Sequence, residues 1–147
     1  MKILLDIDGV MVPISSWKNT KILSDEFPEF SSKAIAALQL LISKTNGDIV
    51  LTTSHKYKYT LEQWIDIFKF RGINICSIER LPYNSDNLSR KEEILNWLDL
   101  NNEESFIIVD DDKSLNSLPN QLKDRLILVS PMIGLTETLV ENFIKNE

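Results

Sequence analysis

Acidic side chains follow the first short apolar segment of this sequence, residues 2–5. Asp6 and Asp8 come directly after it, and Gly9 follows them. Two carboxylates two residues apart can face one site where a strand ends, because glycine lets the backbone turn sharply. An Asp-x-Asp-Gly sequence also occurs in turns and calcium-binding loops. The calcium interpretation is disfavoured here, because residues 10–13 are Val, Met, Val and Pro and supply no further side-chain oxygen.

Hydroxyl side chains follow a second apolar segment, residues 49–51. These are Thr52, Thr53 and Ser54, and the only histidine, His55, comes next. Hydroxyls and free backbone N–H groups at the start of a loop suit a phosphoryl oxygen, which accepts hydrogen bonds. The alternative is that these residues cap a turn or helix. A lone histidine is commonly structural, but the position of His55 makes it a candidate for substrate contact.

Two cations, Arg90 and Lys91, fall in the first turn of a predicted helix. The helix dipole disfavours a cation at this end by about 0.3–1 kcal/mol, and a nearby anion would explain the placement. The alternative is that both are solvated surface residues.

Three adjacent carboxylates, Asp110, Asp111 and Asp112, follow the apolar segment 106–109. Their mutual repulsion would be offset by a divalent cation. Because the ligands are oxygens without Cys or His, magnesium is favoured over zinc or copper. An Asx turn that caps the next segment explains one of the three aspartates but not all of them.

Short apolar runs alternate with amphipathic patterns along the chain. Strands are predicted over 2–5, 48–51, 73–78, 105–109 and 125–129. Helices are predicted after Ser31 and Ser32 up to Gly47, from Thr60 to Gly72, from Ser89 onward, and over about 135–144. This alternation predicts an α/β fold with a parallel sheet, helices on both faces, and active groups at the carboxyl ends of the strands.

Length and composition indicate one soluble globular domain over residues 1–147, with 43% apolar and 26% charged residues. The single cysteine, Cys76, is expected to be a buried strand residue, and it cannot form an internal disulfide. Neither a signal-peptide pattern nor a membrane span is predicted, so a cytoplasmic protein is expected. A net charge of −6 argues against a broad cationic face for nucleic acid, although basic side chains outnumber acidic ones between residues 55 and 91.

The order of these motifs resembles the haloacid dehalogenase (HAD) superfamily. The matching segments are LLDIDGV, IVLTTS, Lys91 ahead of Ile94, and FIIVDDD, and the resemblance runs from residue 2 to about 129. It implies a three-layer Rossmann-like fold with a central, parallel, five-stranded sheet. Neither gap in which relatives carry a cap domain is long enough to hold one here, so a capless phosphatase is expected.

The resemblance implies a role for each matching residue. Asp6 would be the nucleophile that forms an aspartyl-phosphate, and Asp8 the general acid and base. Thr52 would orient the phosphoryl oxygens beside the N–H of Thr53, with Thr53 or Ser54 as alternatives if the strand ends later. Lys91 would balance the negative charge, and Arg90 is the alternative.

The resemblance also implies a Mg²⁺ site. Asp111 would be the principal ligand with Asp110 in support, and the Asp6 carboxylate and Asp8 backbone carbonyl would complete the set. Many relatives have a further acid downstream, whereas Lys113, Ser114 and Leu115 follow here, so Asp112 is a candidate substitute.

An open site suits a bulky phosphorylated group, either a nucleic-acid end or a protein. The segments TTSHK, LEQW, DDD and GLT also resemble HAD domains of bacterial RNA-repair (Swiss Army Knife) proteins. This second resemblance suggests removal of a phosphate from an RNA end, with residues 55–59 as a basic and aromatic strip facing the nucleic acid. The alternative for the strip is a solvated loop.

Two other function classes compete with the phosphatase. A phosphoacceptor receiver module also combines an acidic metal site, a hydroxyl and a lysine, but it carries the phosphorylated Asp on a middle strand of the sequence. A degenerate domain would bind phosphate without turnover, and the complete motif set disfavours it.

Overall fold

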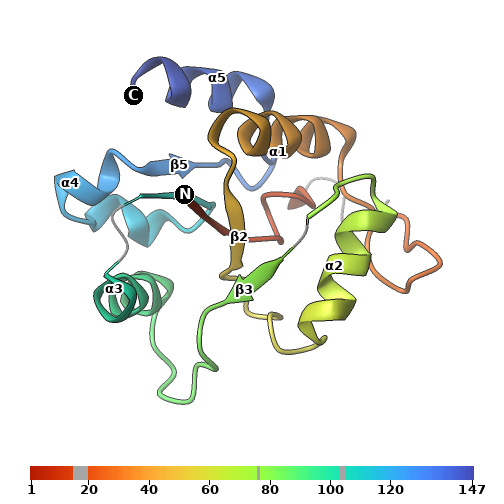
Figure 1. The fold of residues 1–147 in the computed structure, drawn as a ribbon, viewed down its shortest axis with the longest axis horizontal. Coiled ribbons are helices and arrows are strands. Elements are labelled where there is room, and N and C mark those ends of the chain that lie inside the picture. The colour runs from red at the N-terminus through yellow and green to blue at the C-terminus, as the bar shows by residue number, and fades with distance from the viewer. Residues whose placement is uncertain (15–19, 76, 103–104) are drawn as a thin grey trace.

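The computed structural model describes residues 1–14, 20–75, 77–102 and 105–147 (Figure 1). Its strands are β1 (Lys2–Leu5), β2 (Asp48–Leu51), β3 (Ile78–Arg80), β4 (Phe106–Asp110) and β5 (Leu126–Leu128). Its longer helices are α1 (Ser32–Thr45), α2 (Leu61–Phe70), α3 (Arg90–Asn101) and α5 (Glu137–Lys145). A 3-10 helix, η2 (Lys113–Ser117), and a short helix, α4 (Asn120–Lys123), lie between β4 and β5. Cys76, which was predicted to be a buried strand residue, lies outside the described residues.

The strands form one parallel five-stranded sheet in the order β3-β2-β1-β4-β5. The predicted α/β class and parallel sheet are therefore confirmed. β1 lies at the centre, with β2 on one side and β4 on the other, so the strand order reverses at β1. Open α/β sheets bind ligands outside the carboxyl ends of the strands at such a point.

Alternate residues of the central strands enter two separate cores. Ile3 and Leu5 of β1 pack with the face that contacts α1, α2 and α5, whereas Leu4 packs with the face that contacts α3. Side chains of a strand alternate between the faces of a sheet, so a strand covered on both faces is apolar at successive positions. Figure 1 shows the resulting layers, with α1 and α5 above the sheet and α3 below it.

The predicted helix starts are confirmed by side-chain caps. The hydroxyls of Ser31, Thr60 and Ser89 accept hydrogen bonds from backbone N–H groups in the first turns of α1, α2 and α3. At α2, Gln63 completes a capping box by accepting from the Thr60 N–H at 2.8 Å. These caps fix where α3 begins, and its first residue is Arg90.

The third strand differs from the prediction. The apolar pattern predicts it over 73–78, whereas β3 covers Ile78–Arg80. Ile73 instead completes the end of α2, because Gly72 adopts φ +84° and the Ile73 N–H donates to the Phe68 carbonyl at 2.9 Å. As a result Arg80 pairs in register with Leu51, the last residue of β2.

A buried arginine ties the connection between β1 and α1 to the end of α2. Arg71 Nη1 donates to Asp25 Oδ2 at 2.6 Å, and its guanidinium also donates to the carbonyls of Phe27 and Pro28. Hydrogen bonds from Arg71 lower the pKa of Asp25 below its ordinary value. The arginine thereby holds residues 25–28 beside the loop that follows β2, which carries His55.

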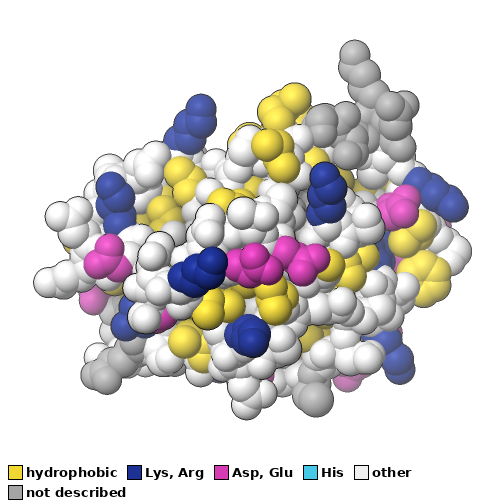
Figure 2. Space-filling view, turned by 90° about the horizontal axis from the view of Figure 1, so that it is seen from above, with side chains coloured by type: hydrophobic (Ala, Val, Ile, Leu, Met, Phe, Trp, Pro, Cys, Tyr) yellow, Lys and Arg dark blue, Asp and Glu magenta, His cyan; other side chains and the backbone are white. Residues whose placement is uncertain are grey.

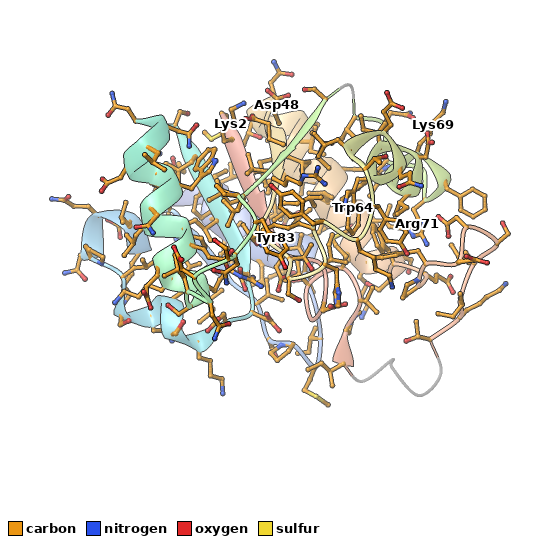
Figure 3. The ribbon with its side chains drawn as sticks, turned by 90° about the horizontal axis from the view of Figure 1, so that it is seen from below. Lys2, Asp48, Trp64, Lys69, Arg71 and Tyr83 are labelled. Carbon is orange, nitrogen blue, oxygen red and sulfur yellow. The ribbon has the colours of Figure 1, made fainter. Side chains whose placement is uncertain are left out.

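The two ends of the sheet are distinct. Lys2 and Asp48 are register partners at the starts of β1 and β2, and they lie together at one edge in Figure 3. The carboxyl ends of the strands, with the candidate residues, lie at the opposite edge. On the outer face over α1 and α5, basic and acidic side chains are interspersed (Figure 2). Within the described residues, no helix has both the length and the apolar character needed to cross a bilayer.

Candidate active site

The residues that follow β1, β2 and β4 meet at the carboxyl edge of the sheet. The pairing continues one residue beyond the strands, since the Asp6 N–H donates to the Val109 carbonyl and the Thr52 N–H donates to the Leu5 carbonyl, both at 3.0 Å. These bonds fix Asp6 and Thr52 next to Asp110, the last residue of β4. The polar side chains are thus held by the rigid centre of the sheet.

Three carboxylates converge at this edge. Asp6, Asp110 and Asp111 each place one oxygen within 4.8 Å of the others. Asp6 is 4% exposed and Asp110 is fully buried. The donor set consists of oxygens alone and carries concentrated negative charge, so it fits a hard divalent cation such as Mg²⁺.

Gly9 makes room for one of these carboxylates. It adopts φ +81°, and a Cβ built on it would lie 2.0 Å from Asp111 Oδ2. A side chain at position 9 would therefore collide with Asp111 and also strain the backbone. The glycine of the Asp-x-Asp-Gly segment is needed for the close approach of the Asp111 side chain as well as for the turn.

Arg90 supplies the cation of the cluster. Its Nη1 atom lies 2.6 Å from Asp110 Oδ2 and 3.5 Å from Asp6 Oδ2. Burial alone would lower the pKa of Arg90, but the charges of Asp110 and Asp6 outweigh it and raise the pKa above its ordinary value. The side chain therefore stays protonated and offsets part of the negative charge.

The two buried aspartates still hold protons more tightly than exposed ones. Burial, followed by the charge of Asp110, raises the pKa of Asp6 well above its ordinary value of 3.8, although Arg90 acts in the opposite direction. Burial also raises the pKa of Asp110, again partly offset by Arg90. Arg90 alone therefore does not offset the cost of burying both charges, and a bound cation would favour the ionised form of both carboxyls.

Lys91, which the motif comparison favours as the cation, lies elsewhere. Its Nζ atom is 3.0 Å from Ser117 Oγ in η2. Successive residues of a helix point about 100° apart, so only one of two neighbours can face the cluster. The side chain that does so is Arg90, the alternative from the sequence.

A buried ion pair lies behind Arg90 and was not foreseen from the sequence. Lys56 Nζ contacts Glu93 Oε2 at 3.0 Å, and Glu93 Oε1 lies 4.0 Å from Arg90 Nε. Both partners are largely buried, and Glu93 stands one helical turn after Arg90. The i, i+3 spacing of Arg90 and Glu93 is the signal that could have indicated this support.

Of the three candidate hydroxyls, Thr52 is the one beside the cluster. Its Oγ1 atom lies 3.5 Å from both Asp110 Oδ2 and Arg90 Nη1. Thr53 is also buried, and its Oγ1 accepts from the His55 N–H at 3.3 Å, which is a turn-capping contact. Ser54 is exposed. The capping alternative therefore describes Thr53 better than Thr52.

His55 lies over the second aspartate of the first segment. Its Nε2 atom is 3.1 Å from Asp8 Oδ2, and both side chains are about half exposed. A small cavity of about 120 Å³ opens beside this pair, lined also by Phe27, Lys58 and Tyr59. Asp8 and His55 thus face an accessible space, in contrast to the buried Asp6.

Asp112 makes hydrogen bonds to neighbouring residues of its own loop. Its Oδ1 atom accepts from the Ser114 N–H at 2.9 Å and caps η2, while its own N–H donates to Asp110 Oδ1 at 3.1 Å. It is the one aspartate of the three that an Asx turn explains.

The predicted strip of residues 55–59 is divided between the core and the surface. Lys56 pairs with Glu93, and Tyr59 packs edge to face on Phe27 and Trp64. His55, Tyr57 and Lys58 are the exposed members. Residues 55–59 therefore do not form a continuous strip on the surface.

A family model described as the HAD domain in Swiss Army Knife RNA repair proteins matches residues 2–140. The match runs from β1 into α5 and takes in every candidate residue named above. No curated protein and no solved structure matches the chain. The match confirms both resemblances drawn from the sequence motifs.

Proposed function

The chain belongs to the family of HAD domains in Swiss Army Knife RNA repair proteins, and from this premise we propose that it is a magnesium-dependent phosphatase acting on a nucleic-acid end. The family supports a phosphohydrolase of the HAD superfamily. The finer assignment depends on one observation. One carboxylate oxygen from each of Asp6, Asp110 and Asp111 lies within 4.8 Å of the others, so the three could bind one cation, and Arg90 lies beside Asp6.

Asp6 is the proposed nucleophile. One of its carboxylate oxygens forms a bond to phosphorus while the bond between phosphorus and the leaving oxygen breaks, which yields an aspartyl-phosphate. Asp8 protonates the leaving oxygen, and it can do so because its carboxyl is partly exposed and contacts His55 rather than the buried cluster. Asp8 then takes a proton from the water that hydrolyses the aspartyl-phosphate, and Asp6 is regenerated.

Arg90 and Thr52 hold the transferring group. Both lie at the Asp110 carboxylate, where a fixed positive charge and a hydroxyl can stabilise phosphoryl oxygens as charge develops. Mg²⁺ bound by Asp6, Asp110, Asp111 and the Asp8 carbonyl would supply the remaining positive charge. Glu93 fixes the guanidinium from behind and is itself neutralised by Lys56.

The open edge of the sheet supports a bulky substrate. Three connections leave the carboxyl edge here: residues 6–31 follow β1, residues 52–60 follow β2, and residues 81–89 follow β3. Within the described parts of these connections, no separate folded unit stands over Asp6 and Asp8. A polymer end can therefore approach without a cap having to open.

The proposal is tested by measuring phosphate release from RNA and DNA oligonucleotides phosphorylated at the 5′ or the 3′ end, with Mg²⁺ or with EDTA. We expect hydrolysis that EDTA and Asp6→Asn abolish, while Asp99→Asn, an exposed change on α3, leaves the rate unaltered. Acid-quenched Asp8→Asn should accumulate the phosphoprotein. A long-lived phosphoprotein in the wild type, without turnover of any phosphoester, would instead favour the receiver-like module.

A further inference from the structure

An exposed aromatic pair with an arginine lies beside the candidate active site. The rings of Tyr57 and Tyr83 meet edge to face with centroids 5.6 Å apart, and Arg80 Cζ lies 4.0 Å from the Tyr57 centroid. Tyr57 is 43% exposed and Tyr83 is 70% exposed. Tyr57, Arg80 and Tyr83 are called the aromatic platform below.

The aromatic platform is held in place before any ligand arrives. Arg80 Nη1 donates to the carbonyls of Lys56 and Tyr59, at 3.0 and 2.9 Å, on either side of Tyr57. The backbone at Lys56 is in turn fixed by Trp64, whose Nε1 donates to the same carbonyl at 3.0 Å. The arginine therefore stacks on Tyr57 from a rigid position, and binding needs little ordering of side chains.

The position of the aromatic platform follows from the pairing of β3 with β2. Arg80 is the register partner of Leu51, and the residue after Leu51 is Thr52 of the candidate site. Neighbouring strands lie about 4.8 Å apart, so the platform begins one strand away from Thr52. Figure 3 shows Tyr83 near the middle of the face between α3 and α2. A pocket of about 250 Å³, lined by Tyr83, Asn84, Trp97 and others, continues from it toward α3.

We propose that the aromatic platform stacks against a nucleobase near the phosphorylated end of a single-stranded nucleic acid whose terminal phosphate lies at Asp6. This inference rests on the proposed function and names how that substrate is recognised. Tyrosine rings and an arginine plane suit the π-face of any base, so recognition is by stacking and does not depend on sequence.

The aromatic platform presents one cation, Arg80, between two neutral rings, which sets this mode apart from a cationic groove. Lys56 is buried and paired with Glu93, so it adds little to the charge that the platform presents. Stacking, rather than phosphate contacts along the backbone, must therefore supply most of the affinity. This fits a protein with a net charge of −6 and predicts a weak dependence on salt.

The test compares two substrates in the wild type and in Tyr83→Ala, Tyr83→Phe and Phe70→Ala. The first substrate is a phosphorylated single-stranded oligonucleotide, as RNA and as DNA, and the second is glycerol phosphate, which has no base. We expect Tyr83→Ala to raise KM for the oligonucleotide by about ten- to a hundredfold and to leave glycerol phosphate hydrolysis unchanged. Tyr83→Phe should restore the wild-type KM, and Phe70→Ala, which alters an exposed ring on α2, should have no effect.

The complementary change is made in the oligonucleotide, where the nucleotides next to the terminal phosphate are replaced by abasic residues. They should raise KM in the wild type by the same factor and have no further effect in Tyr83→Ala. An unchanged KM in Tyr83→Ala, with glycerol phosphate still hydrolysed, overturns the platform and leaves the proposed function intact. A phosphopeptide that depends on Tyr83 in the same way overturns the nucleic-acid assignment.

Binding of a labelled oligonucleotide whose terminal phosphate is replaced by a non-hydrolysable methylenephosphonate separates the platform from the chemistry. If no phosphoester is hydrolysed, the proposed function fails, and loss of this binding in Tyr83→Ala but not Tyr83→Phe still supports the platform. Equal binding by all variants overturns it. A steep fall of affinity with salt would also contradict stacking as the main contribution.

Discussion

The Arg90 guanidinium donates a 2.6 Å hydrogen bond to Asp110, a carboxylate proposed here to hold magnesium. The same Nη1 atom lies 3.5 Å from Asp6, so one side chain balances two buried acids. A phosphoryl group bound at Asp6 would therefore meet a cation that is already fixed by burial and by Glu93.

The role of Arg90 can be separated from that of its neighbour by mutation. Arg90→Ala should lower kcat by about 100- to 1000-fold, because a fixed charge at the transferring group is lost. Lys91→Ala should keep kcat near the wild-type value, because Lys91 contacts Ser117 in η2. Steady-state kinetics with Mg²⁺ measure both, and circular dichroism checks the fold.

Arg90→Lys provides a further comparison, since it keeps the charge but loses the planar guanidinium. We expect intermediate activity. The assignment of the cation would return to Lys91 if Lys91→Ala were the inactive variant and Arg90→Ala the active one.

Gly9→Ala should damage the metal site more than the fold. The added Cβ would lie 2.0 Å from Asp111 Oδ2, so Asp111 must move away from Asp6 and Asp110. We expect weaker binding of Mg²⁺ and loss of phosphatase activity, in addition to a loss of stability of about 1–2 kcal/mol from the positive φ. Isothermal titration with Mg²⁺ and chemical denaturation measure the two effects separately.

Gly72→Ala is the matched control, because Gly72 has φ +84° but no heavy atom within 4 Å of an added Cβ. It should lose a similar amount of stability from the backbone and retain Mg²⁺ binding. Equal Mg²⁺ affinity in the two variants would show that Asp111 does not depend on the space at Gly9.

Stabilisation by Mg²⁺ should increase with pH. The pKa values of Asp6 and Asp110 are raised on folding, so their contribution to stability is complete below the ordinary pKa of 3.8 and is lost as the pH rises through the raised values. Mg²⁺ binds the ionised carboxylates and offsets this loss. The rise in Tm on adding Mg²⁺ should therefore be small in the acidic range just above 3.8 and larger at neutral to mildly alkaline pH.

Thermal unfolding with Mg²⁺ or EDTA across this pH range checks the effect. Asp110→Asn should remove most of the pH dependence of the rise in Tm caused by Mg²⁺, and Asp99→Asn should preserve it. A Mg²⁺ effect on Tm that is independent of pH, or that persists in Asp110→Asn, would contradict a site built on these carboxyls.

Much of the fold was predictable because its signals are local. Ser31, Thr60 and Ser89 cap helices through hydrogen bonds to residues three positions away, and such contacts are visible in sequence spacing. The strand β3 was misplaced because Ile73, although apolar and buried, belongs to the end of α2. Apolar character predicts burial, but it does not say which element a residue joins.

The sequence by itself determined the order of the acidic, hydroxyl and cationic segments along the chain, and with it the family and the parallel sheet. Only the tertiary structure decided that Arg90 rather than Lys91 faces the acids, that Lys56 is buried against Glu93, and that Tyr83 joins Tyr57. The physical reason is that strand order and helix rotation set contacts between residues far apart in the chain. Sequence spacing carries no information about those distances.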